Sequence, residues 1–306
     1  MEYHINQFDL FFITYNEPLA EEFWADLQEK VPWAKRVNNI KGFDSAHREC
    51  ANQSETPFLL TVDGDNLIDP KIMDLKINIS EEQYDWAWSW NGLNYVTGLT
   101  YGNGGIKLWS KDFIFNMHSH ENSTDSKHSV DFCWNNKYKH LPGCYSTSYT
   151  NGTPFQAFRS GFREGVKMSL HEGERLSYSS LKNNIWHENL NRLIVWCSIG
   201  ADVEYGDWSI YGARLGAVKS LIENWDHTLI NNYDWFETYW KEEISPLYNG
   251  NDIYCIRSNY GYNKSLLQLD ITKLGNKLKS EVSLDICEID PNTSLFIKKY
   301  YSKANV

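Results

Sequence analysis

Two aspartates, two positions apart, are the residues best suited to chemistry in this chain. Asp63 and Asp65 flank Gly64 directly after the apolar run Pro57–Val62. Paired carboxylates can face one divalent cation, and the glycine between them lets the backbone bend and approach a phosphate closely. Mg²⁺ and Mn²⁺ take such oxygen ligands and would neutralise the diphosphate of a nucleotide sugar. A plain polar turn is the competing interpretation, because Asp-Gly is a common turn pair.

Three further features could contribute to a site. Asp131 stands between apolar neighbours, and a carboxylate there could take a proton from an acceptor hydroxyl, although a helix cap or a surface ion pair would also explain it. His171 and His187 could complete a metal shell, but a single histidine is more often structural. The glycine-rich run Tyr101–Gly105 lacks the spacing of dinucleotide or triphosphate loops. It predicts either a close backbone approach to a sugar or a hairpin with positive φ angles.

The predicted secondary structure places the aspartate pair at the edge of a sheet. In chain order it consists of a strand over Phe8–Tyr15, a helix over Leu19–Lys30, a strand over Lys35–Val37, a helix over Asp44–Gln53 and a strand over Pro57–Val62. This alternation indicates an open α/β sheet with mostly parallel strands. Ligands of such sheets lie beyond the carboxyl ends of the strands, where the two aspartates stand.

The later part of the chain is more varied. Residues 81–115 are strand-like and rich in Trp and Tyr, and helices are expected over Phe155–Leu170 and Leu190–Ile199. The tail alternates apolar and polar residues over Val282–Ile289 and Leu295–Ile297. We therefore expect a small α/β or helical extension at the C-terminal end.

Composition excludes some classes of protein. The formal net charge of −11 argues against a chain that coats nucleic acid by bulk electrostatics. No apolar run is long enough for a membrane helix, and the first residues lack the pattern of a secretory signal, so we expect a cytoplasmic protein that does not bind membranes. The six cysteines show neither zinc spacing nor the density of a disulfide framework.

An ordered series of segments adds a family resemblance. The segments are Phe11–Pro18, Trp24–Leu27, Ala34–Val37, Lys41-Gly42, Ala46-His47, Val62–Asp65, Asn91–Leu93, Tyr101–Leu108, Val130-Asp131, Phe158–Glu164, Arg192-Leu193, Trp196-Cys197, Gly200–Asp202 and Gly212–Gly216. In this order they resemble the TET-associated glycosyltransferases of bacteriophages. The resemblance covers roughly residues 8–220. It implies a glycosyltransferase domain over 1–220 and leaves 221–306 as a C-terminal extension of unknown role.

The resemblance implies a GT-A type fold and an activity. The expected reaction moves a sugar from a UDP-sugar to a hydroxymethyl pyrimidine, such as 5-hydroxymethylcytosine, in phage DNA, after a TET-like oxygenase has made the hydroxymethyl group. If the chain is phage-encoded, the compartment would be the host cytoplasm. The expected metal is Mn²⁺ or Mg²⁺.

The resemblance also implies roles for particular residues. Asp63 and Asp65 would hold the metal and the diphosphate, and Asp131 would be the base by analogy with related inverting enzymes. His187 is a candidate third metal ligand by its residue type, independently of the resemblance. The remaining residues of the expected donor and acceptor region are Thr14, Tyr15, Tyr101, Gly104, Gly105 and Lys107.

Two other functions stay open. The first is the same enzyme class with a glycan, lipid or protein hydroxyl as acceptor, and the second is a non-catalytic sugar-binding module. The negative net charge bears on this choice, because duplex DNA needs a cationic track. A flipped or single-stranded base would need less contact area and could stack on Trp or Tyr rings.

Overall fold

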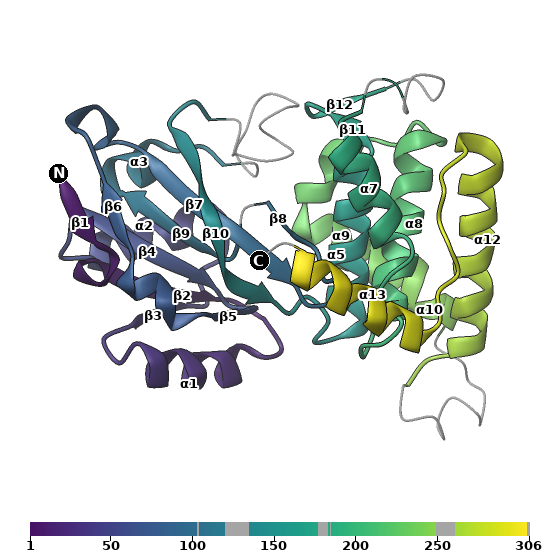
Figure 1. Cartoon of the computed structure of the whole chain (residues 1–306). Helices are drawn as coiled ribbons and strands as arrows, with labels where there is room; N and C mark the ends of the chain where they lie inside the picture. Colours follow the sequence, from purple (N-terminus) through teal and green to yellow (C-terminus); the bar gives the residue numbers. More distant parts are fainter. Residues whose placement is uncertain (103, 120–134, 177–182, 184, 249–260, 305–306) are drawn as a thin grey trace. The chain divides into compact units, whose positions relative to one another are not determined.

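The computed structural model describes residues 1–102, 104–119, 135–176, 183, 185–248 and 261–304, and it places the backbone but not the side chains of 301–304. The chain divides into two compact units, Met1–Thr150 with Tyr301–Val306, and Asn151–Tyr300. Figure 1 shows a sheet in the first unit and helices in the second. The sequence predicted a boundary at residue 220 instead, and the packing of the helices explains the difference below.

The first unit is built on an eight-stranded sheet with the order β3-β2-β4-β9-β7-β10-β5, and β8 pairs with β7. The strands are β2 (Asp9–Thr14), β3 (Lys35–Asn38), β4 (Phe58–Asp63), β5 (Asn66–Ile68), β7 (Ala87–Asn94), β8 (Thr100–Tyr101), β9 (Ile106–Ser110) and β10 (Tyr138–Ser148). Strands β3, β2 and β4 are parallel, as are β7 and β10, while β9 runs antiparallel to β4 and β7. The α/β sheet flanked by helices that the sequence predicted is confirmed, and among the described strands it is mixed, with three parallel and four antiparallel pairings.

Helices cover both faces of this sheet because the central strands are apolar on both sides. Leu10 and Phe12 of β2 pack in one cluster with residues of α1 (Ala20–Lys30). The alternate residue, Phe11, packs in a second cluster with residues of α2 (Phe43–Gln53) and α3 (Lys111–Asn116). The unit also contains β1 (Glu2–His4) paired with β6 (Lys76–Asn78), and the short 3₁₀ helices η1 (Ile5–Gln7), η2 (Pro70–Asp74) and η3 (Glu81–Gln83).

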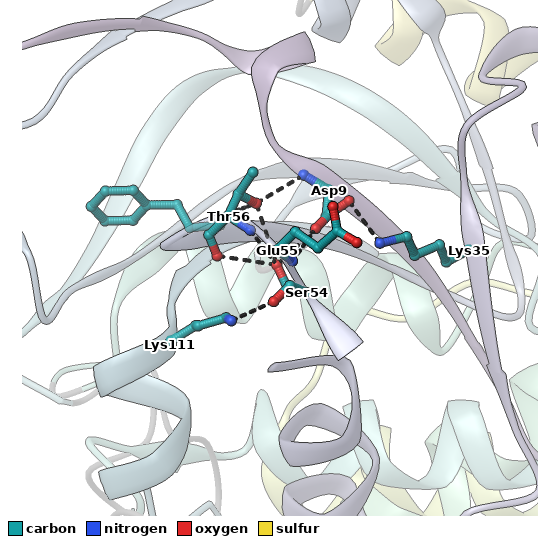
Figure 2. Close-up of polar contacts among 7 residues, drawn as sticks. Asp9, Lys35, Ser54, Glu55, Thr56 and Lys111 are labelled. Atoms are coloured by element: carbon teal, nitrogen blue, oxygen red, sulfur yellow. Dashed lines mark hydrogen bonds and ion pairs between the residues drawn. The ribbon is translucent and has the colours of Figure 1, made fainter. Parts of the chain in front are cut away.

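A hydrogen-bond network closes the amino end of β2 (Figure 2). One carboxylate oxygen of Asp9 accepts from the Ser54 hydroxyl at 3.0 Å and from the Glu55 N–H at 2.6 Å. The other lies 3.1 Å from the Lys35 ammonium. The Lys111 ammonium donates to the Ser54 carbonyl. This end of the sheet is therefore tied together by bonds within the protein.

The second unit is mainly helical. Its elements are α5 (Pro154–Lys167), α7 (His187–Trp196), α8 (Gly206–Leu221), η6 (His227–Asn231), α9 (Tyr233–Tyr239), the π-helix η7 (Trp240–Ile244), α10 (Ser245–Tyr248), α12 (Lys264–Val282), α13 (Pro291–Ala304) and the small strands β11 (Leu170–His171) and β12 (Glu174–Arg175). None of the described helices combines the length and the apolar character needed to cross a membrane.

Four glycines hold α5 and α8 together. A Cβ atom added to Gly161, Gly165, Gly212 or Gly216 would lie 2.0–2.3 Å from a carbonyl oxygen of the facing helix. The two helices therefore meet backbone to backbone. This seam explains why the chain divides before α5: α5 cannot belong to a different unit from α8.

The C-terminal extension is helical rather than α/β. Residues 283–290 join α12 to α13 without forming a strand, although Leu284 and Ile286 are buried while Asp285 and Cys287 are exposed. The alternation of apolar and polar residues in the sequence is matched by alternating burial, but this segment pairs with no described strand. Buried Arg214 of α8 contacts it through Glu288, at 2.5 Å.

Candidate active site

The aspartate pair lies at the carboxyl end of β4, as the sequence predicted. Asp63 is the last residue of the strand, and its N–H donates to the Gly105 carbonyl at 2.8 Å. Gly64 follows in close contact with the neighbouring strand: a Cβ there would lie 2.8 Å from the Ile13 carbonyl oxygen and 2.9 Å from Thr14 Cγ2. Only a glycine fits between the two aspartates without displacing the end of β2.

Asp63 balances a buried lysine. Lys107 Nζ lies 3.3 Å from Asp63 Oδ2, and the lysine side chain is 5% exposed whereas the aspartate side chain is 38% exposed. The register of β4 and β9 pairs Thr61 with Lys107, which places the ammonium just below the carboxyl end of β4. A buried ammonium needs a compensating charge. The pair therefore puts a fixed cation and a partly exposed carboxylate at the same strand end.

Asp65 is oriented by Asn66. The Asn66 amide donates to Asp65 Oδ1 at 2.6 Å, and its oxygen accepts from the Ser148 hydroxyl at 2.6 Å. The Tyr149 N–H also donates to the Asp65 carbonyl at 2.8 Å. The start of β5 and the end of β10 thus hold the second aspartate. Asn66 is not among the residues predicted from the sequence, where its one local signal is its place directly after the aspartate pair.

The glycine-rich run lies between β8 and β9, each of which pairs with β7 and not with the other. Gly102 has a φ of +72°, a left-handed conformation that favours glycine, and residue 103 lies outside the described residues. A Cβ on Gly104 would lie 2.8 Å from the Asn91 backbone, and one on Gly105 would lie 2.0 Å from Asn66 Cγ. Each glycine therefore leaves space for another part of the protein: the Asn91 backbone at Gly104 and the Asn66 side chain at Gly105. Tyr101 pairs with Gly92 of β7, and a role for these residues toward a sugar stays a prediction.

Thr14 and Tyr15 stand at the carboxyl end of the adjacent strand. The Thr14 hydroxyl donates to Asn38 Oδ1 at 2.8 Å and accepts from Arg36 Nε at 3.0 Å, so it serves to connect β2 and β3. Tyr15 is exposed, and its N–H donates to Glu17 at 2.7 Å. The exposed Tyr15 ring therefore fits the expected donor region better than the Thr14 hydroxyl, which already makes its hydrogen bonds within the protein.

His47 of α2 lies beneath the same edge, and the sequence analysis gave it no role. Its Nδ1 is 2.8 Å from the Phe43 carbonyl, and its buried Nε2 has no hydrogen-bond partner among the described residues. Burial lowers the pKa of His47 to about 4, against the opposing effects of the Phe43 carbonyl and the Asp63 carboxylate. The imidazole is therefore neutral at neutral pH.

The donor atoms fit a hard divalent cation. Asp63 and Asp65 offer carboxylate oxygens, which Mg²⁺ and Mn²⁺ prefer, and both side chains are partly exposed. No group of three His, Cys, Asp or Glu side chains able to hold a metal occurs among the described residues. His187 belongs to the helical unit, where its Nδ1 lies 3.1 Å from the Asn191 amide. Its predicted role as a third ligand stays untested, and Asp131 lies outside the described residues.

No protein-family model and no curated protein matches this chain. Among solved structures, the chain is similar to residues 1–349 of the glycosyltransferase TarS from S. aureus, with 11% identity over 80% of this chain and 94% of that one, and a TM-score of 0.30. It is also similar to a protein described as a glucose-1-phosphate thymidylyltransferase from Bacillus anthracis, in complex with a sucrose, with 13% identity over 47% of this chain and 70% of that one, and a TM-score of 0.30.

Proposed function

We propose that this protein is a glycosyltransferase that takes its sugar from a nucleotide sugar, with a UDP-sugar as the expected donor. One observation carries the proposal: at the carboxyl end of β4, Asp63 lies 3.3 Å from the buried ammonium of Lys107, and Asp65 follows two residues later. This is the edge at which open α/β sheets bind ligands. The two carboxylates could hold a cation. That cation and the lysine ammonium would together neutralise the negative charge of a diphosphate.

The residues of this edge divide the work of holding a diphosphate leaving group. Asp63 and Asp65 would hold a Mn²⁺ or Mg²⁺ ion, which supplies charge neutralisation for the departing nucleoside diphosphate. Lys107 supplies a second positive charge from the protein, and Asn66 keeps the Asp65 carboxylate in one orientation. Asp131, the predicted base, stays part of the proposal without support from the described residues.

The proposed acceptor is a hydroxymethyl pyrimidine in DNA, made by a TET-like oxygenase. The resemblance of the ordered segments supports it, and the net charge of −11 limits it to a flipped or single-stranded base. A glycan, lipid or protein hydroxyl is the alternative acceptor. A sugar-binding module without catalysis would use neither the aspartates nor a metal.

The test combines nucleotide binding with transfer. The protein is titrated with UDP and Mn²⁺ by calorimetry, and it is incubated with UDP-sugars, Mn²⁺ and an oligonucleotide that contains 5-hydroxymethylcytosine. Asp65→Asn should lower transfer at least about 100-fold, because the variant loses a charged ligand of the cation. Asp74→Asn, on the exposed end of η2, is the matched control and should leave transfer unchanged.

Each outcome separates the candidates. UDP binding without any DNA product would move the acceptor to a glycan, lipid or protein. Sugar binding that needs no metal, and that persists in Asp63→Ala combined with Asp65→Ala, would replace the enzyme with a binding module.

A further inference from the structure

Four neighbouring strands form a polar row on the face of the sheet that α2 covers. The register pairs Thr61 of β4 with Lys107 of β9, Lys107 with Ser89 of β7, and Ser89 with His140 of β10. Residues paired in this way point to the same face. The next row toward the amino end of β4 is apolar and consists of Leu59, Trp109, Ala87 and Tyr138. The face thus changes from apolar to polar just below the candidate site.

The polar row joins the Asp63–Lys107 pair to an exposed histidine. Thr61 and Ser89 are fully buried and Lys107 is 4% exposed, whereas His140 is exposed. Lys107 reaches Asp63 at 3.3 Å, and the Ser89 hydroxyl lies 3.2 Å from His140 Nδ1. Neighbouring strands lie about 4.8 Å apart, so the His140 backbone is roughly 10 Å from that of Lys107. The diphosphate and sugar of a donor held at Asp63 could span this distance, which would place the anomeric carbon and the attacking hydroxyl within reach of His140.

We propose that His140, in place of the Asp131 predicted from the sequence, is the group that takes the proton from the acceptor hydroxyl during sugar transfer; the inference rests on the donor site of the proposed function. The other members of the row cannot do so: Lys107 is an ammonium, and the hydroxyls of Thr61 and Ser89 are not basic. Asp63 is already paired with Lys107. His140 is the row's basic group, and it stands where the row reaches the surface.

The contact with Ser89 is compatible with the tautomer that this role requires, because the serine hydroxyl can accept from Nδ1–H as well as donate to Nδ1. When Nδ1–H donates to the Ser89 oxygen, Nε2 carries the lone pair and can accept a proton. The acceptor oxygen then forms a bond to the anomeric carbon, the bond from that carbon to the diphosphate oxygen breaks, and its electron pair leaves with the diphosphate. The acceptor proton moves to Nε2, and the imidazolium later releases it to solvent.

The surroundings keep the imidazole neutral before the reaction. The part of the imidazole that the protein covers loses solvation, and this lowers the pKa of His140 from its usual value of 6.5 although the residue as a whole is exposed. The flanking strands β7 and β5 contain no titratable side chain. Within the polar row, the charged side chain is Lys107 of β9. On the neighbouring η2 the charged groups are Lys71 and Asp74, and Tyr138, Lys139, Cys144 and Tyr145 share β10 with the histidine.

The test uses the full chain and the variant His140→Gln, which keeps an amide able to bond Ser89 but has no basic nitrogen. Transfer from UDP-glucose to the hydroxymethylcytosine oligonucleotide is measured, together with UDP release to water when no oligonucleotide is present. We expect kcat for both to fall about 100-fold. The decline of kcat/KM at acid pH should disappear, and the affinity for UDP with Mn²⁺ should stay within twofold of the wild-type value.

Two comparisons make the result decisive. Ser89→Ala should shift the acid limb of the pH profile with a smaller loss of rate, and Asp131→Asn tests the base predicted from the sequence. If His140→Gln keeps the wild-type rate and acid limb while Asp131→Asn loses them, the inference is overturned. If the wild-type chain binds no UDP, the proposed function fails first, and that failure appears in calorimetry rather than in the pH profile.

Discussion

The two ends of the same sheet treat their aspartates in opposite ways. At the amino end, Asp9 is 16% exposed and its oxygens accept from Ser54, Glu55 and Lys35. At the carboxyl end, Asp63 is 38% exposed and makes one contact of 3.3 Å with Lys107. Asp9 stabilises the fold through hydrogen bonds and an ion pair within the protein, whereas the Asp63 carboxylate is partly exposed to solvent.

The pKa values follow the same division. Burial would raise the pKa of Asp9, but hydrogen bonds from Glu55, Lys35 and Ser54 outweigh it and lower the pKa below 3.8. At the other end, burial lowers the pKa of His47 and its Nε2 has no partner among the described residues. Polar groups are thus satisfied by the protein at one end and incompletely at the other, which is typical of a surface built for a ligand.

The largest expected effect is the pH dependence of the free energy of unfolding that His47 causes. Above pH 6.5 the imidazole is neutral in both the folded and unfolded states, so it contributes nothing to the pH dependence. Between pH 6.5 and about 4 the unfolded chain binds a proton that the folded chain excludes, and stability falls by up to about 3 kcal/mol. Chemical denaturation at several pH values should show this slope in the wild type and lose it in His47→Gln. The exposed His187→Gln should keep it; an unchanged slope in His47→Gln would contradict the assignment.

The next largest effect should come from the amino end. Asp9→Ala leaves the Glu55 N–H and the Lys35 ammonium without their acceptor, so the free energy of unfolding should fall by about 2 kcal/mol. UDP affinity should not change, because the network lies at the opposite end of the sheet. Glu55→Ala keeps the backbone N–H and should have little effect on stability. A loss of UDP affinity in Asp9→Ala would mean that the amino end also affects ligand binding, and it would contradict the contrast between the two ends.

The smallest effect should come from Gly105. In Gly105→Ala the new Cβ would overlap Asn66, which must turn away and lose its bonds to Asp65 and Ser148, at about 1 kcal/mol. UDP affinity with Mn²⁺ should fall as well, because Asp65 loses its orientation. Combining Gly105→Ala with Asn66→Ala removes the overlap, so the two losses should not add. Additive losses would mean that Asn66 does not transmit the effect.

The sequence predicted the elements around the site better than the residues that complete it. Apolar runs and helix-breaking residues locate β2, β4, α1 and α2 within a few positions, and the parallel direction of β2, β3 and β4 follows from their alternation with helices. Asn66 and His47 depend on contacts between distant strands and helices, which no local pattern reveals. A lysine inside the apolar run of β9 was the available signal for Lys107, since a buried ammonium requires a partner.

The division of the chain into compact units before α5 could not be read from the sequence for a similar reason. Gly161 and Gly165 in one helix and Gly212 and Gly216 in another have no visible relation until the two helices face each other. The alternation over residues 283–290 was seen, but whether an extended segment finds a partner strand depends on the rest of the fold.

The glycine seam between α5 and α8 also limits how the helical unit can open. With no side chains between the two backbones, neither helix can loosen by exchanging rotamers, and separating them exposes peptide groups along the whole seam. The two helices should therefore come apart in a single step. Their slowest-exchanging amide hydrogens should share one opening free energy in native-state hydrogen exchange.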